Sequence, residues 1–147
     1  MITAVDTSVL LDIFTADPDF GPGSAAAVRR CIADGAMIAS PVVWAETSAT
    51  FPETLAAEQA LERLRIEFSA LDATAAFRAG EAWRAYRRAG GTRERVIADF
   101  LIAAHALLAA DRLLTRDRGF YRRWFKGLKL LDPSATPPGD PPGPSPG

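Results

Sequence analysis

The sequence predicts an α/β domain in which helices cover both faces of a mainly parallel central sheet. Two observations support this fold class. Short apolar runs rich in β-branched residues alternate with longer amphipathic segments, which is the pattern of consecutive βα units. The chain has 147 residues, of which 48% are hydrophobic, and this is enough to form one core of ordinary size.

The first half of the chain begins with an apolar run at residues 2–5, which we interpret as a buried strand. The polar residues at 6–8 can cap the helix that follows, and Pro41 suits the first turn of a later helix. The expected strands are 2–5 and 36–39, and the expected helices are 8–14, 24–32, one opened by Ser40-Pro41, and 56–68.

The second half is expected to continue the alternation. A helix at 73–89 should turn Phe77, Ala82, Trp83 and Tyr86 inward and end at Gly90-Gly91. Further elements are expected as strands at 69–72, 113–115 and 128–131 and as a strongly apolar helix at 96–110. From Pro133 onward the chain is almost wholly Pro, Gly, Ser and Ala, so we expect one domain at 1–132 and a disordered tail at 133–147.

Composition excludes several classes of protein. Cys31 is the only cysteine, so an intrachain disulfide and a cysteine-based metal site are both excluded. The N-terminus has neither the basic region nor the apolar stretch of a signal peptide. No segment approaches the roughly 20 apolar residues of a membrane helix. We therefore expect a cytoplasmic protein with no membrane partner.

Charge is distributed unevenly along the chain. Residues 1–75 contain 4 Lys/Arg against 11 Asp/Glu, whereas residues 76–147 contain 13 against 7. An arginine-rich half can face nucleic acid, because the planar guanidinium binds phosphate, or it can form a solvated helix face. Charge alone does not decide between them. The arginines concerned are Arg84, Arg87, Arg88, Arg93, Arg95, Arg112, Arg116, Arg118, Arg122 and Arg123.

Four carboxylates occupy unusual places. Asp6 and Asp117 follow predicted strands, and such strand ends meet at one edge of a parallel sheet, where ligands bind. Asp99 and Glu46 lie in otherwise apolar helical segments, where an unpaired charge is costly. Each could serve only as a cap, turn or surface residue. Together they predict a site for Mg²⁺ or Mn²⁺, which prefer hard oxygen ligands.

Other signals are weaker. The run Gly21-Pro22-Gly23 does not follow a strand directly, so it does not predict dinucleotide binding. His105 is expected to be a packed or surface residue, because no nucleophile elbow accompanies Ser8, Ser40 or Ser48. We interpret the remaining acids as cap and turn residues, with Asp111 close enough to Asp117 to support it: Asp12, Asp72 and Asp111.

Four segments resemble, in order, the motifs of the PIN-domain ribonucleases, and their spacing is similar to that of the VapC toxins of toxin–antitoxin pairs. The resemblance covers residues 1 to about 132, and only the Pro/Gly-rich tail departs from it. The segments are Asp6-Thr7-Ser8-Val9-Leu10-Leu11-Asp12, Trp44-Ala45-Glu46, Ala98-Asp99-Phe100-Leu101-Ile102-Ala103-Ala104-His105-Ala106 and Leu114-Thr115-Arg116-Asp117.

The resemblance implies a PIN-like α/β/α sandwich and assigns roles to residues. Asp6, Glu46, Asp99 and Asp117 would be the catalytic acids that bind Mg²⁺ or Mn²⁺. It also implies a cognate antitoxin and a homodimer. It further implies that Thr7, Ser8 and Thr115 supply hydroxyls near the metal or its water. Apart from the resemblance, we expect arginines, Arg95 and Arg116 among them, to bind the phosphates of the substrate.

The sequence thus predicts metal-assisted hydrolysis of RNA phosphodiester bonds. The chain offers no well-placed His or Lys base, which agrees with this chemistry. The alternative is a non-catalytic PIN-like module that binds RNA or a protein. A phosphatase with Asp6 as nucleophile is disfavoured, because Ser8 stands where a second aspartate is needed.

Overall fold

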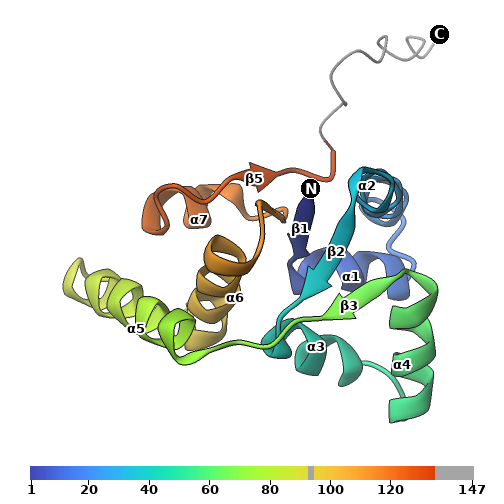
Figure 1. The fold of residues 1–147 in the computed structure, drawn as a ribbon, viewed down its shortest axis with the longest axis horizontal. Helices are drawn as coiled ribbons and strands as arrows, with labels where there is room; N and C mark the ends of the chain where they lie inside the picture. Colours follow the sequence, from blue (N-terminus) through green and yellow to red (C-terminus); the bar gives the residue numbers. More distant parts are fainter. Residues whose placement is uncertain (93–94, 135–147) are drawn as a thin grey trace, which may run out of the picture.

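The computed structural model describes residues 1–92 and 95–134, and within them one parallel sheet forms the centre of the molecule (Figure 1). Its strand order is β3-β2-β1-β4-β5, and every neighbouring pair is parallel. This confirms the predicted α/β/α sandwich. The strands are β1 (Ile2–Val5), β2 (Ala36–Ala39), β3 (Ile66–Phe68), β4 (Arg112–Leu114) and β5 (Leu130–Leu131).

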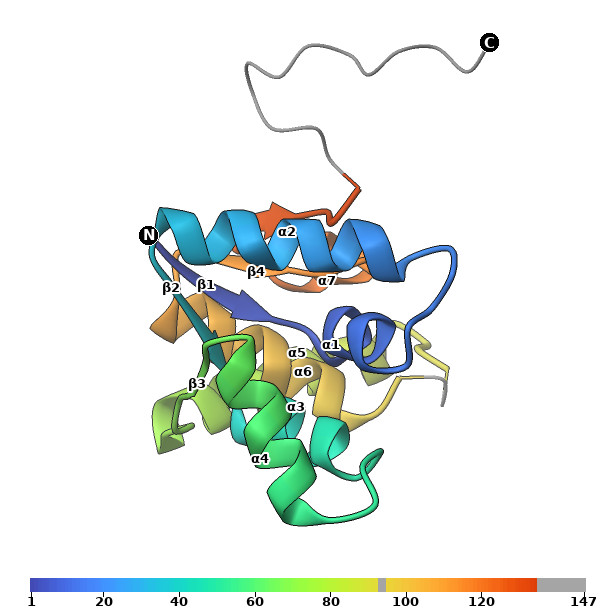
Figure 2. The same ribbon diagram turned by 90° about the vertical axis from the view of Figure 1, so that its right-hand side faces the viewer.

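The helices lie on both sides of this sheet. Helix α2 runs along one side, and α5 and α6 pack together on the other (Figures 1 and 2). In the described part of the chain the helices are α1 (Thr7–Phe14), α2 (Gly21–Asp34), α3 (Pro41–Ser48), α4 (Thr54–Arg63), α5 (Ala73–Arg88), α6 (Ile97–Ala109) and α7 (Arg118–Trp124).

Local sequence explains where several helices begin. The Ser40 side chain accepts a hydrogen bond from the Val43 N–H at 3.3 Å, and Pro41 occupies the first turn of α3. The Asp72 carboxylate accepts one from Ala75 N–H at 2.9 Å at the start of α5. The predicted capping role of Asp72 is therefore confirmed.

The core lies between the sheet and the helices. Strands β1, β2 and β4 are buried on both faces, as their continuous apolar runs predict. On the α5–α6 side, aromatic rings join three helices: Tyr86 of α5 contacts Phe100 of α6, and both contact Phe120 of α7 at centroid distances between 5.3 and 6.3 Å. Helix α7 is thereby fixed beside the edge of the sheet that carries Asp117.

The structure corrects the prediction between residues 56 and 72. The expected helix 56–68 ends at Arg63, because Arg65 adopts a positive φ of 58° that stops the helix. The strand expected at 69–72 lies earlier, at Ile66–Phe68, where Ile66 is buried and Phe68 is exposed. The apparently helical spacing of the apolar residues was misleading here.

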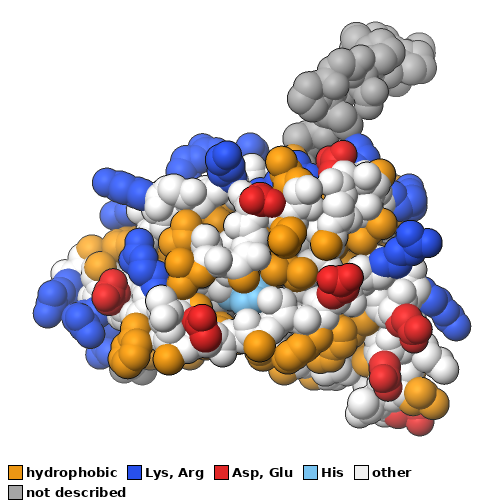
Figure 3. Space-filling view, in the orientation of Figure 1, with side chains coloured by type: hydrophobic (Ala, Val, Ile, Leu, Met, Phe, Trp, Pro, Cys, Tyr) orange, Lys and Arg blue, Asp and Glu red, His pale blue; other side chains and the backbone are white. Residues whose placement is uncertain are grey.

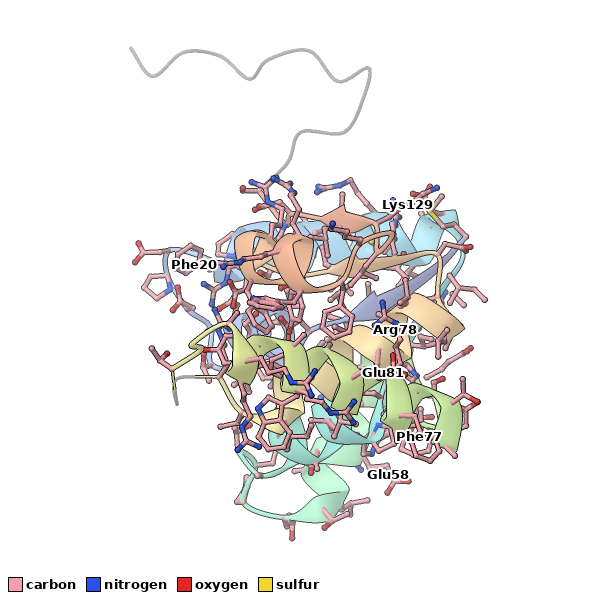
Figure 4. The ribbon with its side chains drawn as sticks, turned by 90° about the vertical axis from the view of Figure 1, so that its left-hand side faces the viewer. Phe20, Glu58, Phe77, Arg78, Glu81 and Lys129 are labelled. Carbon is pink, nitrogen blue, oxygen red and sulfur yellow. The ribbon has the colours of Figure 1, made fainter. Side chains whose placement is uncertain are left out.

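Other differences are smaller. Phe77 was expected to point inward but is 76% exposed, and it projects from α5 in Figure 4. Helix α2 begins at Gly21 rather than residue 24, and Gly21 packs closely on the backbone oxygen of Asp12. Helix α7 was not predicted, and the last strand is shorter than expected.

The prediction of a disordered tail concerns residues that, apart from Pro133 and Ser134, lie outside the described part of the chain, and so does Arg93. The division at residue 132 therefore stays a prediction. Among the described residues no helix combines the length and apolar character needed to cross a bilayer.

Candidate active site

Asp6 stands at the centre of the candidate site, where β1 ends and α1 begins. Its Oδ1 accepts a hydrogen bond from the Thr7 N–H at 2.8 Å, which caps α1. Its Oδ2 accepts hydrogen bonds from the hydroxyls of Thr115, at 2.7 Å, and Tyr121, at 3.2 Å. The side chain is buried, and no Lys, Arg or His of the described residues forms an ion pair with it.

Asp117 is brought beside Asp6 by the pairing of β1 with β4. Val5 is opposite Leu114 in this pair, so Thr115 and Asp117 follow at the same edge of the sheet as Asp6. Thr115 links the two acids, because its hydroxyl donates to Asp6 and accepts from the Asp117 N–H at 3.0 Å. The Asp117 carboxylate is partly exposed, at 40%.

Asp99 enters the site from the first turn of α6. Its Oδ2 accepts a hydrogen bond from the Val96 N–H at 3.3 Å, which caps the helix. The negative charge of Asp99 acts on Asp6, and that of Asp117 acts on Asp99, so these three carboxylates form one electrostatic cluster. The strand-end argument from the sequence placed Asp6 and Asp117 at one edge of the sheet, and α6 brings Asp99 to the same place.

Glu46 lies at the rim of the cluster. It is exposed on α3, and its Oε1 accepts a hydrogen bond from the Thr7 hydroxyl at 2.9 Å. Because Thr7 also donates its N–H to Asp6, one residue connects Glu46 to the centre. The structure therefore joins Asp6, Asp99 and Asp117 electrostatically and links Glu46 to them through Thr7.

The electrostatics of the cluster are unfavourable for an isolated protein. Burial raises the pKa of the Asp6 carboxyl, the charge of Asp99 raises it further, and the hydrogen bonds from Thr115, Thr7 and Tyr121 oppose the shift. Burial likewise raises the pKa of Asp99, and the charge of Asp117 adds to it. Burial and the nearby acids raise the pKa of Tyr121 as well, so its hydroxyl stays a proton donor.

The oxygen atoms of these residues are of the type that binds a divalent cation, but their positions in this structure do not form a ready metal site. Among residues 1–92 and 95–134, no three His, Cys, Asp or Glu side chains are gathered as a ready metal site. The donors, however, are hard carboxylate oxygens that repel one another, and a cation would relieve that repulsion. Two buried hydroxyls, of Ser8 and Thr47, also have no hydrogen-bond partner within the described structure, and each lies within two residues of an acid of the cluster.

Arg95 and Arg116, the two arginines expected to contact substrate, differ in position. Arg95 contacts the Asp117 carboxylate directly, and its guanidinium lies 4.2 Å from the centroid of the Phe120 ring. Burial opposes its charge, but Asp117 and Asp99 raise the pKa of Arg95, so it stays a cation within the acidic cluster. Arg116 instead points to α1, where its Nε and Nη2 donate to Asp12 at 2.8 and 2.9 Å.

The structure corrects the interpretation of two further acids. Asp12 is neither a cap nor a turn residue: it is buried and binds Arg116 through both oxygens and the Ser24 hydroxyl at 2.9 Å. Asp111 precedes β4 and accepts a hydrogen bond from the Ile2 N–H at 2.6 Å. It therefore lies at the opposite edge of the sheet and cannot support Asp117.

Tyr121 belongs to the site, although the sequence analysis did not single it out. It contacts Asp6 from α7, and only its position near Asp117 in the sequence could have pointed to it.

His105 is a packed residue, as expected: its Nε2 lies 2.9 Å from the Ser69 hydroxyl, and burial lowers its pKa. This contact leaves His105 out of any triad with Ser8, Ser40 or Ser48.

Comparison with known proteins agrees with this arrangement. The model of the family described as PIN domain matches residues 3–126. No curated protein sequence matches the chain significantly.

Three solved structures illustrate the shared fold. VapBC2 from Rickettsia felis, bound to a DNA fragment from its promoter, has a TM-score of 0.70 and 22% identity, with 90% of this chain and 98% of that chain covered. VapBC-1 from nontypeable Haemophilus influenzae gives 0.69 and 18%, covering 92% and 100%. A toxin–antitoxin complex from Klebsiella pneumoniae gives 0.61 and 18%, covering 89% and 97%.

Proposed function

The chain belongs to the PIN domain family, and from this premise we propose that it is a metal-dependent ribonuclease that hydrolyses RNA phosphodiester bonds. One observation carries the proposal: the carboxylates of Asp6, Asp99 and Asp117 share one edge of the sheet, with Glu46 attached through Thr7, and no cationic side chain of the described residues pairs with Asp6. Such a cluster needs a cation from outside.

In the proposed site the four acids hold Mg²⁺ or Mn²⁺. The bound cation would supply activation of the attacking water and stabilisation of the leaving oxygen. Thr7 and Thr115 orient the carboxylates, because each hydroxyl donates to one of them. Tyr121 holds Asp6 from the other side. Ser8 is proposed to face the metal or its water, since its buried hydroxyl is otherwise without a partner among the described residues.

The proposed substrate contacts come from arginine. Arg95 is suited to bind a phosphate next to the acids, because it already reaches Asp117 and its guanidinium is held over the Phe120 ring. Arg116 is less suited, since its Nε and Nη2 both donate to Asp12. We retain Arg95 as a substrate-binding residue and assign Arg116 to the support of α1.

We further propose that the protein is the toxin of a toxin–antitoxin pair, acting as a homodimer in the cytoplasm. The similarity in fold to VapBC structures and to a toxin–antitoxin complex supports this proposal. Exposed apolar side chains such as Phe68 and Phe77 offer a surface for assembly. Light scattering should report twice the 15.8 kDa chain mass, and the chain expressed alone should arrest bacterial growth until its antitoxin is co-expressed.

The decisive experiment is cleavage of single-stranded and stem-loop RNA by the purified protein with Mg²⁺, with Mn²⁺ and with EDTA. The proposal requires cleavage that depends on the metal and is lost in Asp99→Asn. The competing function is a non-catalytic module that binds RNA or protein. It is favoured by the contact of Arg95 with Asp117, which neutralises one acid. RNA binding without cleavage at saturating metal would establish that module instead.

A further inference from the structure

A groove lies between the end of α5 and the start of α6, outside the acidic cluster but adjoining it. It has a volume of about 660 Å³. We call it the α5–α6 groove, and its principal wall residues are Trp83, Tyr86, Arg87, Arg95, Val96 and Ile97.

The walls of the groove combine an aromatic ring, apolar side chains and two cations. Trp83 is half-buried, with the Arg87 guanidinium 5.5 Å from the centroid of its ring. Val96 and Ile97 are 54% and 37% exposed, which is unusual for such side chains beside a helix start. Tyr86 is buried beneath them, and its hydroxyl donates to the Thr92 carbonyl at 2.9 Å, so the floor is rigid.

One wall of the α5–α6 groove also borders the acidic cluster. Arg95 lines the groove and also contacts Asp117. The Val96 N–H donates to Asp99, so the backbone that carries the apolar wall also fixes this acid. A group held in the groove is therefore next to residues that contact the acids.

The positive charge continues beyond the groove along α5. A second hollow, of about 520 Å³, shares Trp83 and Arg87 with the groove and adds Arg84 and Arg88. In Figure 3, blue Lys and Arg side chains gather at the left end of the molecule, over the end of α5 and over α7. Glu81, the acid on the same helix, lies beside Arg78 at 3.9 Å, and Figure 4 shows the two together.

We propose that the α5–α6 groove binds one unpaired base of single-stranded RNA, with Trp83 as the stacking platform and Arg87 and Arg95 on the flanking phosphates. This inference rests on the proposed function and names its substrate class. Aromatic stacking beside arginine is the usual way in which proteins hold unpaired bases. A base paired in a duplex is stacked and cannot enter, so the groove selects single-stranded segments or loops.

The charge of the groove favours RNA over a protein segment as the occupant. An apolar peptide would use Val96 and Ile97 but would leave Arg84, Arg87 and Arg88 without a role. A nucleotide uses both features, because it carries an aromatic face and a phosphate. The run of arginines along α5 then follows the phosphates on one side of the bound base.

Binding of a fluorescein-labelled single-stranded RNA of about 12 nucleotides, measured in EDTA, tests the groove apart from cleavage. Trp83→Leu should weaken binding roughly 5- to 100-fold, as expected for loss of one stacked base, and Trp83→Phe should restore most of it. Arg87→Gln should weaken binding and lower the salt slope by about one. Trp44→Phe and Arg63→Gln, which lie on α3 and α4 away from the groove, are the matched controls and should bind like the wild type.

A second measurement separates a loss of fold from a loss of stacking. In a protein with Trp44 and Trp124 replaced by Phe, the fluorescence of Trp83 should be quenched by RNA but not by an abasic strand with the same phosphates. The proposal that the groove binds a base is overturned by either of two results. The first is equal binding of RNA and the abasic strand, and the second is unchanged RNA binding by a folded Trp83→Leu protein. A Trp83→Leu protein that binds RNA normally but loses a protein partner assigns the groove to that partner instead.

The two proposals fail separately. If the wild type never cleaves RNA with metal while Trp83→Leu still loses RNA binding, the proposal of ribonuclease activity is wrong and the proposal of a base-binding groove is supported. If the wild type cleaves but Trp83→Leu retains the KM of the wild type for single-stranded RNA, the groove fails and the nuclease stands.

Discussion

Two buried aspartates lie near the two ends of α1, and they differ in whether a cationic side chain pairs with the carboxylate. Asp12 is 5% exposed, and its carboxylate is neutralised by a bidentate ion pair with Arg116. Asp6 is 7% exposed, and its carboxylate is held only by hydroxyls and one N–H. Burial of a charge is costly without a partner. The protein supplies that partner for Asp12, whereas no Lys, Arg or His of the described residues pairs with Asp6.

The contrast shows that burial alone does not mark a functional acid. Asp12 serves the fold, since with Arg116 and Ser24 it ties α1 to α2 and to the segment after β4. Asp6 serves the site, since its neighbours Asp99 and Asp117 increase the negative charge there. The useful criterion is whether the local structure provides a compensating charge.

The largest expected effect is that of replacing Asp6. Asp6→Asn should lower RNA cleavage roughly 100-fold or more, because it removes a proposed metal ligand from the centre of the cluster. It should also abolish the rise in melting temperature on adding Mg²⁺. Asp12→Asn is the matched control and should keep that rise. Full cleavage by Asp6→Asn at saturating metal would remove Asp6 from the site.

The second expected effect concerns Asp12 and Arg116. Asp12→Asn and Arg116→Met should each destabilise the fold by on the order of 2 kcal/mol, less than for a fully buried pair because the Arg116 side chain is 34% exposed. The double variant should lose less than the sum of the two, since neither partner is then left alone. Urea unfolding measures all three. A fully stable Arg116→Met protein with a raised KM would instead support a role in substrate binding.

A smaller effect is expected at Arg95. Its guanidinium neutralises Asp117, so Arg95→Gln should tighten Mn²⁺ binding roughly 2- to 5-fold, the range expected for a partly exposed ion pair. Calorimetric titration measures this directly. RNA cleavage should nevertheless fall, through a higher KM. Arg112→Gln, which removes the ion pair with Asp34 at the opposite edge of the sheet, is the control and should change neither value.

The smallest expected effect is on pH dependence. Burial raises the folded-state pKa of Asp6 and Asp99 above the ordinary 3.8. A raised folded pKa stabilises the protein fully below the unfolded pKa, and this contribution is lost as pH rises through the folded value. The contribution of these two acids to the melting temperature in EDTA should therefore fall as pH rises above about 4. The fall should be shallower with Mg²⁺ or in Asp99→Asn, and identical slopes would contradict the repulsion described here.

Much of the fold and the position of the acids could be predicted from the sequence, because they depend on local patterns. Apolar runs gave β1, β2 and β4, and the acids directly after strands had to meet at one edge of a parallel sheet. Helix α7 was missed because it is short and rich in arginine, with no clear apolar period. Strand β3 was displaced because apolar residues happened to fall at helical spacing.

The partners of the acids could not be predicted, since they are distant in sequence. Asp12 and Arg116 are separated by 104 residues, and Tyr121 and Asp6 by 115. Nothing local to Asp12 indicates that it is neutralised, so the sequence suggests only a cap or turn residue there. Arg95 and Asp117 are separated by only 22 residues, but no local pattern predicts their contact, by which Arg95 neutralises one acid of the cluster.

The pairing of β1 with β4 has a consequence for how the protein comes into existence on the ribosome. The first strand made is the central one, yet its neighbour on one side, Arg112–Leu114, is synthesised more than 100 residues later. Pairing of this kind is non-local and slow to form. A nascent chain therefore lacks Thr115, Tyr121 and Asp117 around Asp6 until most of it has emerged. The acidic edge is completed late in translation, so a truncated translation product ending before β4 would carry Asp6, Glu46 and Asp99 without Asp117 and without the Thr115 and Tyr121 hydroxyls that hold Asp6.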